Sequence, residues 1–305
     1  MDVSLVVPVL NRKEYIEKTI DSIVSSRVAF QEIILVDNGS TDGTYELVQT
    51  FPRRYSIPII VIREEKAGAP AARNRGLLQS SCKWVCFFDS DDEFTGFPDS
   101  WDDDADLVCF PTVMVAGSKE KVRDFTPVAN PYVHILNSML NTLGMVFRTA
   151  FLKSIVGWNE NCLVWDDWEL GLRALISSNK TQWLTDRAYH RILIHPDSLT
   201  GVGFSGNFEK ICRTLAVAVE DTMHIEDDKE RNRCLLALFY RVCILAGNLH
   251  REGNFNASES LAEDFTYVHP SQNLHLHAGR VLKWYTGIGG RGSWRIALFL
   301  VKLLK

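Results

Sequence analysis

Short apolar runs alternate with amphipathic stretches along the first hundred residues. The runs rich in β-branched and aromatic residues, which predict buried strands, are residues 3–7, 32–36, 57–62 and 84–88. The stretches with apolar positions at helical spacing are residues 12–26, 44–51 and 71–79. Strands separated by helices predict a parallel sheet with right-handed crossovers, and the ligands of such sheets bind outside the carboxyl ends of the strands.

The alternation changes after residue 98, where predicted strands and helices mix in an α+β pattern. The predicted strands there are 106–111, 144–147, 182–185 and 189–194, and the predicted helices are 149–155 and 166–176. From residue 206 onward only helical periodicity remains. Because single cores stop growing at about 250–300 residues, we expect an α/β domain over 1–204, with halves 1–98 and 99–204, and a helical region over 205–305.

Composition and charge argue against several classes of protein and partner. The net charge of −5 and the isoelectric point near 5.9 speak against a nucleic-acid partner, because such proteins carry a basic surplus. The seven cysteines form no CxxC pair, which favours reduced thiols over a disulfide framework or a zinc ribbon. The first residues lack the basic segment of a secretory signal, and no apolar run approaches the ~20 residues of a membrane span. These features predict a cytoplasmic location.

Polar or glycine-containing loops follow the four N-terminal strands, at 8–11, 37–43, 66–68 and 89–92. In the last loop, Asp89 and Asp91 stand at positions i and i+2, which project to the same side of an extended chain. Magnesium and manganese favour a few carboxylates together with the phosphate oxygens of a substrate. The loop therefore predicts a divalent-cation site, with a solvated acidic turn as the alternative.

Two other loops offer groups that suit a nucleotide. Asp37 and Asn38 end the second strand with donors and acceptors suited to a base edge or a ribose, although the same loop can serve only to cap the next helix. The segment 68–76 opens a helix that carries Arg73 and Arg75 in its first turns. These arginines suit a phosphate, although a surface helix with solvated arginines has the same pattern.

Four segments stand in the order Val-Val-Pro-Val-Leu-Asn, Asp-Asn-Gly-Ser-Thr-Asp-Gly-Thr, Ala-Ala-Arg-Asn-Arg-Gly-Leu and Phe-Asp-Ser-Asp-Asp. With this order the chain resembles the family 2 glycosyltransferases over residues 1–200. The resemblance implies the GT-A fold, an α/β fold with a mostly parallel, Rossmann-like sheet flanked by helices, here followed by a C-terminal helical appendage. It also implies a nucleotide-sugar-binding half at 1–98 and an acceptor-binding half at 99–204.

The resemblance further implies an inverting, metal-dependent hexosyltransferase. Such an enzyme moves a sugar from a nucleotide-diphosphate sugar, with a UDP-sugar favoured, to a hydroxyl of a saccharide or lipid-linked saccharide acceptor. Its cofactor is a divalent cation, Mn²⁺ or Mg²⁺. Bacterial relatives of this type build capsule, O-antigen or other cell-surface polysaccharides. The sequence leaves the sugar, the base, the acceptor and the oligomeric state open.

The resemblance also assigns roles to particular residues. The positions that match nucleotide-binding residues of the family are Pro8, Val9, Leu10, Asn11, Asp37, Asn38, Gly68, Arg73, Asp89 and Ser90. Asp89, Asp91 and His195 match metal ligands. Arg191 and His195 match residues that fold over the diphosphate, although a lone histidine also has a structural alternative.

The same resemblance assigns catalytic roles to Asp166 and Asp167 at the start of a predicted helix, with Asp167 as the general base. Capping of that helix by either acid is the alternative. Three positions depart from the family pattern: Asn38, Lys66 and Asp166 stand where many relatives have Asp, Asn and Glu. These departures leave the reaction class intact and leave the preferred nucleotide open.

Two other functions compete with this interpretation. A sugar-1-phosphate nucleotidyltransferase also uses acids and a metal on an α/β sheet, but it favours a glycine-rich loop after the first strand, and residues 8–11 contain no glycine. A catalytically silent scaffold of a membrane assembly would show no metal-dependent nucleotide binding. The GxGxxG pattern at 287–292 has no predicted strand before it and no acid after it, so we expect a turn there and not a dinucleotide site.

The last forty residues are basic and aromatic. Between Phe265 and Lys305 there are six lysines or arginines and no acid, interleaved with Trp284, Trp294 and Phe299. This composition suits an amphipathic helix on an anionic membrane surface, so we expect a peripheral contact through 280–305 at the inner face of the plasma membrane. A helix whose apolar stripe packs on the core is the equal alternative.

Overall fold

The computed structural model describes residues 2–123, 125–194, 203–265, 268, 270 and 272–303, which fall into two compact units. The first unit is formed by Met1–Pro127, Leu140–Leu163 and Ser177–Pro196. The second is formed by Val128–Met139, Val164–Ile176 and Asp197–Lys305. Two segments from the range expected for the α/β domain therefore pack with the C-terminal helices. The division of functions among 1–98, 99–204 and 205–305 stays a prediction.

The first unit is built on a seven-stranded sheet with the order β3-β2-β1-β4-β8-β5-β9. The strands are β1 (Val3–Val9), β2 (Glu32–Asp37), β3 (Ile59–Arg63), β4 (Trp84–Phe87), β5 (Leu107–Cys109), β8 (Met145–Arg148) and β9 (Thr181–Trp183). Strands β3, β2, β1 and β4 run parallel, β8 is antiparallel to both its neighbours, and β9 is parallel to β5. The carboxyl ends of β1, β2 and β4 therefore meet at one edge of the sheet.

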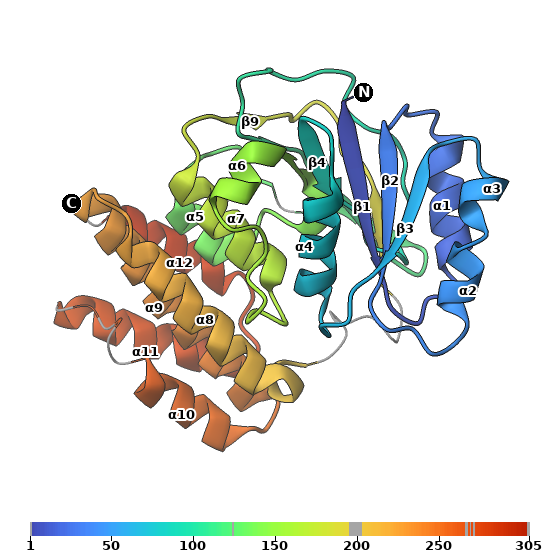
Figure 1. Ribbon diagram of the computed structural model, residues 1–305. Helices are drawn as coiled ribbons and strands as arrows, with labels where there is room; N and C mark the ends of the chain where they lie inside the picture. Colours follow the sequence, from blue (N-terminus) through green and yellow to red (C-terminus); the bar gives the residue numbers. More distant parts are fainter. Residues whose placement is uncertain are drawn as a thin grey trace. The chain divides into compact units, whose positions relative to one another are not determined.

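Helices cover both faces of this sheet (Figure 1). The helices on one face are α1 (Ile16–Ser25), α2 (Thr44–Val48) and α3 (Phe51–Arg54), and the helix on the other is α4 (Ala69–Gln79). Alternate residues of β1 divide between the two faces: Leu5 and Val7 join the core cluster that contains Ile16 and Ile20 of α1, while Val6 faces α4. A Cβ on Gly76 would lie 2.3 Å from Val6 Cγ1. Glycine at this position therefore allows α4 to approach β1 closely.

The same unit contains a small second sheet with the order β10-β6-β7. Its strands are β6 (Val113–Ala116), β7 (Lys119–Val122) and β10 (Arg191–Leu193), and helix α6 (Thr149–Ser154) and a 3₁₀ turn at Thr142–Gly144 complete the unit. Sequence periodicity did not predict the β6–β7 hairpin. Its second strand is exposed along its whole length, so it has none of the apolar alternation that marks a half-buried strand.

The second unit is helical. Its helices are α5 (Pro131–Asn137), α7 (Asp166–Ser177), α8 (Phe208–Met223), α9 (Asp228–Arg251), α10 (Phe255–Asp264), α11 (Asn273–Gly287) and α12 (Ser293–Lys302), with a 3₁₀ turn at Phe204–Asn207. Helix α9 is central, and α5, α8, α10, α11 and α12 pack against it. The turn predicted at 287–292 is confirmed, because α11 ends at Gly287 and α12 begins at Ser293.

Helix α9 is long and apolar enough to cross a bilayer, the one such helix within the described ranges. Of its most apolar window, 61% is buried by other residues. Gly247 of α9 shows how close the packing is, because a Cβ there would lie 2.5 Å from the backbone oxygen of Lys283 in α11. With this burial, α9 is a core helix of the second unit.

Candidate functional site

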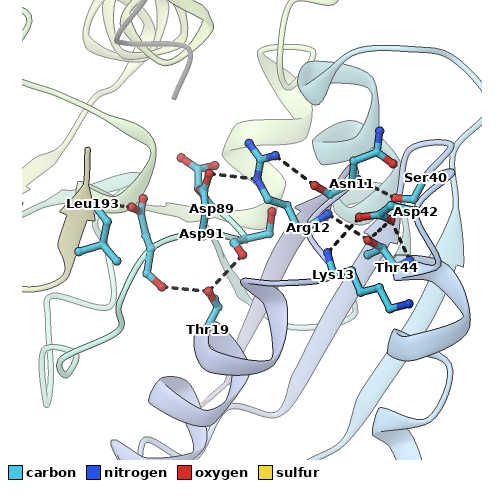
Figure 2. A network of polar contacts seen from close by, with 12 residues as sticks. Asn11, Arg12, Lys13, Thr19, Ser40, Asp42, Thr44, Asp89, Asp91 and Leu193 are labelled. Carbon is cyan, nitrogen blue, oxygen red and sulfur yellow. Dashed lines mark hydrogen bonds and ion pairs between the residues drawn. The ribbon is translucent and has the colours of Figure 1, made fainter. Parts of the chain in front are cut away.

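The loops after β1, β2 and β4 meet at the carboxyl edge of the large sheet, as the strand order predicted (Figure 2). The loop after β1 is joined by several hydrogen bonds to the loop after β2 and to the start of α2. Asn11 N donates to Ser40 Oγ at 3.0 Å, Thr41 N donates to Asn11 Oδ1 at 2.8 Å, and Arg12 N donates to Thr44 Oγ1 at 3.0 Å. Asn11 has a φ of 50°, a left-handed conformation that asparagine tolerates better than most residues. The backbone N–H and the side-chain oxygen of Asn11 thus both bind the second loop.

Asp42 holds the start of α2. Its Oδ1 accepts from Thr44 N at 2.9 Å, and its Oδ2 accepts from Lys13 N at 3.3 Å (Figure 2). Desolvation acts to raise the pKa of the carboxyl, but the hydrogen bonds from Thr44 and Lys13 outweigh it, and the pKa lies below its ordinary value. Asp42 therefore binds the first amide of α2 from the position before the N-cap, which is Gly43 and has no side chain to cap the helix.

Asp37 and Asn38 are both bound by their own chain. Asp37 is fully buried, with its Oδ2 3.1 Å from Arg63 Nε. Asn38 Nδ2 donates to the backbone oxygens of Glu64 and Lys66 at 3.0 and 2.8 Å, and its Oδ1 accepts from Gly68 N at 2.8 Å. The asparagine thus ties the end of β2 to the loop that leads into α4. A contact of either side chain with a nucleotide stays a prediction.

The acidic loop after β4 is bound to neighbouring elements at each of its polar residues. Asp89 accepts a hydrogen bond from Arg73 Nη2 at 2.8 Å, and Asp91 Oδ2 lies 3.1 Å from Arg12 Nε. The buried Arg73 also lies over the ring of Trp158, 4.4 Å from its centre. The side chains of Asp89 and Asp91 retain 33% and 17% of their exposure, so both carboxylates can still reach a ligand.

Asp92 differs from its two neighbours because it is buried. Its Oδ1 accepts from Leu193 N at 2.7 Å, and Thr19 Oγ1 donates to the backbone oxygens of Ser90 and Asp92 at 3.1 and 3.0 Å. Burial, followed by the charge of Asp89, raises the pKa of Asp92 to about 9. The carboxyl fixes the loop to β10 through its hydrogen bond from Leu193.

The chemistry of this loop fits a divalent cation. Asp89 and Asp91 present carboxylate oxygens, the donors that Mg²⁺ and Mn²⁺ prefer, and such ions are often held by one or two carboxylates together with phosphate oxygens and water. Among the described residues no group of three histidine, cysteine or acidic side chains could hold an ion without such help. His195, the third predicted ligand, lies outside the described residues.

Arg191 lies in β10 and is engaged with two acids. Its Nη1 lies 3.2 Å from Glu93 Oε2, and its Nη2 pairs with Glu120 of β7. Its backbone also pairs with that of Glu93. The predicted contact of Arg191 with a diphosphate stays a prediction, and it would require the guanidinium to share or exchange these partners.

Asp166 and Asp167 begin α7 in the second unit, as the sequence predicted. Asp167 Oδ1 accepts from Trp168 N at 2.8 Å, so its carboxylate lies at the helix N-terminus. This carboxylate therefore binds an amide of the first turn of α7, and its part in a proton transfer stays a prediction.

The start of α7 is anchored by aromatic side chains. The guanidinium of Arg241 from α9 lies over the rings of Trp165 and Trp168, 4.4 and 4.2 Å from their centres. Thr214 Oγ1 of α8 donates to the backbone oxygen of Val164 at 2.8 Å. These contacts hold the first turn of α7 against α8 and α9, and sequence reasoning did not identify them.

A cavity of about 460 Å³ lies in the second unit, where the sequence indicated no site. It is lined by residues 205–210 and by Asn254, Asn256, Ala257 and Ser260. Its amide and hydroxyl side chains are not associated with the motifs of the sheet edge.

Comparison with known proteins supplies the family. The sequence profile described as Glycosyl transferase family 2 matches residues 4–123, the segment that contains β1 to β4 and the acidic loop. Residues 4–123 therefore match the family 2 glycosyltransferase domain. The first unit has the GT-A fold that the resemblance implied, and the expected C-terminal helical region is present in the second unit.

Two bacterial proteins show the extent of the sequence similarity. The putative teichuronic acid biosynthesis glycosyltransferase TuaG of Bacillus subtilis is 37% identical over 92 residues, which are 30% of this chain and 36% of TuaG. The poly(ribitol-phosphate) beta-N-acetylglucosaminyltransferase TarS of Staphylococcus aureus is 27% identical over 205 residues, which are 62% of this chain and 35% of TarS. The chain spans about a third of the length of these relatives.

Solved structures extend the likeness of fold beyond the glycosyltransferase domain. The structure of TarS residues 1–349 in complex with UDP-GlcNAc matches with a TM-score of 0.72 at 19% identity, over 99% of this chain and 92% of that one. The mannosyltransferase PcManGT of Pyrobaculum calidifontis, in complex with GDP-Man and Mn²⁺, matches with a TM-score of 0.57 at 14% identity, over 99% of this chain and 84% of that one. At these identities the likeness concerns the fold alone.

Proposed function

We propose that this protein transfers a sugar from a nucleotide-diphosphate sugar, with UDP as the preferred carrier, to a hydroxyl acceptor of a cell-surface polysaccharide. The observation that carries the proposal is the meeting of the acidic loop 89–92 with the loops after β1 and β2 at one sheet edge. Teichuronic and teichoic acid enzymes among the relatives support the substrate class, and the UDP-GlcNAc complex of TarS supports the donor class. Because we take the acceptor to be a saccharide or a lipid-linked saccharide, we assign the reaction to the inner face of the plasma membrane.

In this proposal the donor is held by the sheet edge. Asp89 and Asp91 would hold a divalent cation, and the cation would offset the negative charge of the departing diphosphate. Arg73 orients Asp89 through their hydrogen bond. The Mn²⁺ complex of PcManGT supports the presence of a metal in this fold. The nucleoside is assigned to the edge that residues 8–11, Asp37 and Ser90 build, where Leu10 and Asn11 are exposed.

The transfer step assigns the proton to Asp167. Its carboxylate takes the proton of the acceptor hydroxyl as the oxygen forms a bond with the anomeric carbon. The bond between that carbon and the phosphate oxygen breaks, and the nucleoside diphosphate leaves with the electron pair. A single displacement of this kind inverts the anomeric configuration. The presence of Asp167 in the first turn of α7, next to Asp166, supports the role.

Calorimetry with UDP and Mn²⁺ tests the donor site. We expect metal-dependent binding in the wild type and a loss of about tenfold or more in Asp91→Asn, which corresponds to at least ~1.4 kcal/mol. The matched control is Asp103→Asn, an exposed acid that pairs with Lys83 away from the sheet edge. Equal UDP affinity with and without Mn²⁺ in the wild type would refute the donor site. It would instead favour a scaffold without catalysis.

Release of UDP from UDP-GlcNAc, with poly(ribitol phosphate) as the first acceptor, tests the base. We expect Asp167→Asn to lower kcat by about 10²–10⁴-fold, the range of general base catalysis, with the UDP affinity unchanged. Asp228→Asn, another acid in a first helical turn, is the control. A near-normal kcat in Asp167→Asn would remove this residue from the mechanism while leaving the donor site intact.

A further inference from the structure

The last two helices each carry a buried stripe of mostly small or polar residues and an exposed stripe of large apolar residues. The buried residues of α11 are His275, Gly279, Leu282 and Thr286, and those of α12 are Ser293, Ala297 and Val301. The exposed apolar residues of the same segment are Leu274, Val281, Trp284, Ile288, Ile296, Phe299 and Leu303. Packing against α9 and α5 accounts for the first stripe, while the second is left open among the residues described for this unit.

The exposed residues are arranged as a surface and not scattered. Leu274, Val281, Trp284 and Ile288 are spaced by 7, 3 and 4 positions, which keeps them on one side of α11. That side is opposite the buried stripe, because at 100° per residue the two sets differ by about half a turn. Most of them are more than three-fifths exposed, among them Trp284 at 63%.

The exposed stripe of α12 follows the same rule. Ile296, Phe299 and Leu303 are spaced by 3 and 4 positions, and Phe299 is 62% exposed. Isolated exposed apolar side chains are common on folded proteins, but rows of large ones indicate a surface that contacts a partner or a membrane. We call these seven residues of α11 and α12 the tail surface.

Charge identifies the kind of partner. Residues 266–305 contain six lysines or arginines and no acid. Four of these cations are exposed: Arg280, Arg291, Arg295 and Lys302. The chain as a whole is acidic, with a net charge of −5, so this concentration of positive charge is local. A partner that complements the exposed apolar side chains and the cations must have an apolar interior and a negatively charged surface.

We propose that the tail surface lies in the interfacial region of an anionic lipid bilayer. Helices of this composition bind in the plane of a membrane, with the apolar side among the upper acyl chains and the cations among the headgroups. Tryptophan favours the level of the headgroups, which suits the exposed Trp284. A second copy of this chain is the weaker occupant, because two such surfaces would bring their cations together. The membrane contact does not depend on the proposed transfer reaction.

Vesicle sedimentation with the full chain tests this proposal. We expect the wild type to bind vesicles of phosphatidylcholine and phosphatidylglycerol at least tenfold more tightly than vesicles of phosphatidylcholine alone, and high salt to weaken the binding. The variant Trp284→Ser with Phe299→Ser removes the two largest exposed side chains and should lose at least tenfold in affinity. Arg280→Gln with Arg295→Gln should lose the preference for anionic vesicles.

Met223→Ser is the matched control, because Met223 is 58% exposed on α8, outside the tail surface. Unchanged UDP binding and circular dichroism in the variants separate a membrane defect from a folding defect. Equal binding of both vesicle types, or binding that survives both double variants, overturns the proposal. The proposal is also overturned if the wild type binds no vesicles but self-associates, and if Trp284→Ser with Phe299→Ser abolishes the self-association. That result would assign the surface to a second copy of the chain.

Discussion

Arg12 Nε lies 3.1 Å from Asp91 Oδ2, which joins the loop after β1 to the acidic loop after β4 (Figure 2). The backbone N–H of Arg12 also donates to Thr44 Oγ1 of α2, at 3.0 Å. One residue therefore connects three segments that are far apart in the sequence. The guanidinium of Arg12 and a divalent cation would bind the same carboxylate, that of Asp91. The ion pair therefore competes with the proposed metal.

Arg12→Ala should raise the affinity of the protein for Mn²⁺ measured without nucleotide. Both side chains of the ion pair are less than a quarter exposed, and partly exposed pairs contribute about 1 kcal/mol or less. Removal of the competitor should therefore strengthen Mn²⁺ binding by up to about fivefold. Calorimetric titration with MnCl₂ measures the change, with Arg53→Ala on α3 as the control. An unaltered Mn²⁺ affinity would mean that the metal does not use Asp91.

Asn38→Asp should destabilise the protein, although many relatives have an acid at this position. The amide of Asn38 donates two hydrogen bonds to backbone oxygens, and an aspartate would face both oxygens with lone pairs. Loss of the two bonds and repulsion in a buried site should lower the free energy of unfolding by about 2–3 kcal/mol. Urea denaturation of Asn38→Asp beside the exposed Asn256→Asp measures this difference. Equal midpoints in the two variants would contradict the structural role of the amide.

His190→Phe should change the dependence of stability on pH. His190 is buried against Phe94, at 4.4 Å between ring centres, and burial lowers its pKa to about 3 from the ordinary 6.5. Between these values the unfolded chain binds a proton that the folded protein does not accept. The wild type should therefore lose about 1.4 kcal/mol of stability for each pH unit below 6.5, as far as about pH 3.

The phenylalanine variant lacks this proton. Its free energy of unfolding should rise relative to that of the wild type as the pH falls from 6.5 to 4.5, since all other titrating groups are the same in both proteins. Urea unfolding at several pH values gives the difference directly. A difference that stays constant over this range would show that His190 is protonated in the folded protein at mildly acid pH.

The sequence predicted the features that depend on residues close together along the chain. The apolar runs predicted β1 to β4, and the polar loops predicted the sheet edge at which Asp89 and Asp91 lie. The helix that begins at Asp166 was predicted from its spacing and its acids. Short-range patterns suffice for these features, because periodicity and turn residues act within a few positions of the chain.

Other features required the folded chain. The partner of Asp91 is 79 positions away, and Arg191 turned out to be engaged with Glu93 and with Glu120, 71 positions away. The hairpin β6–β7 and the grouping of Val128–Met139 with the C-terminal helices were likewise not predicted. Local patterns thus determined the elements and the motif-bearing loops. The pairing of particular side chains was decided by tertiary packing, because it depends on distances in space that no short stretch of sequence contains.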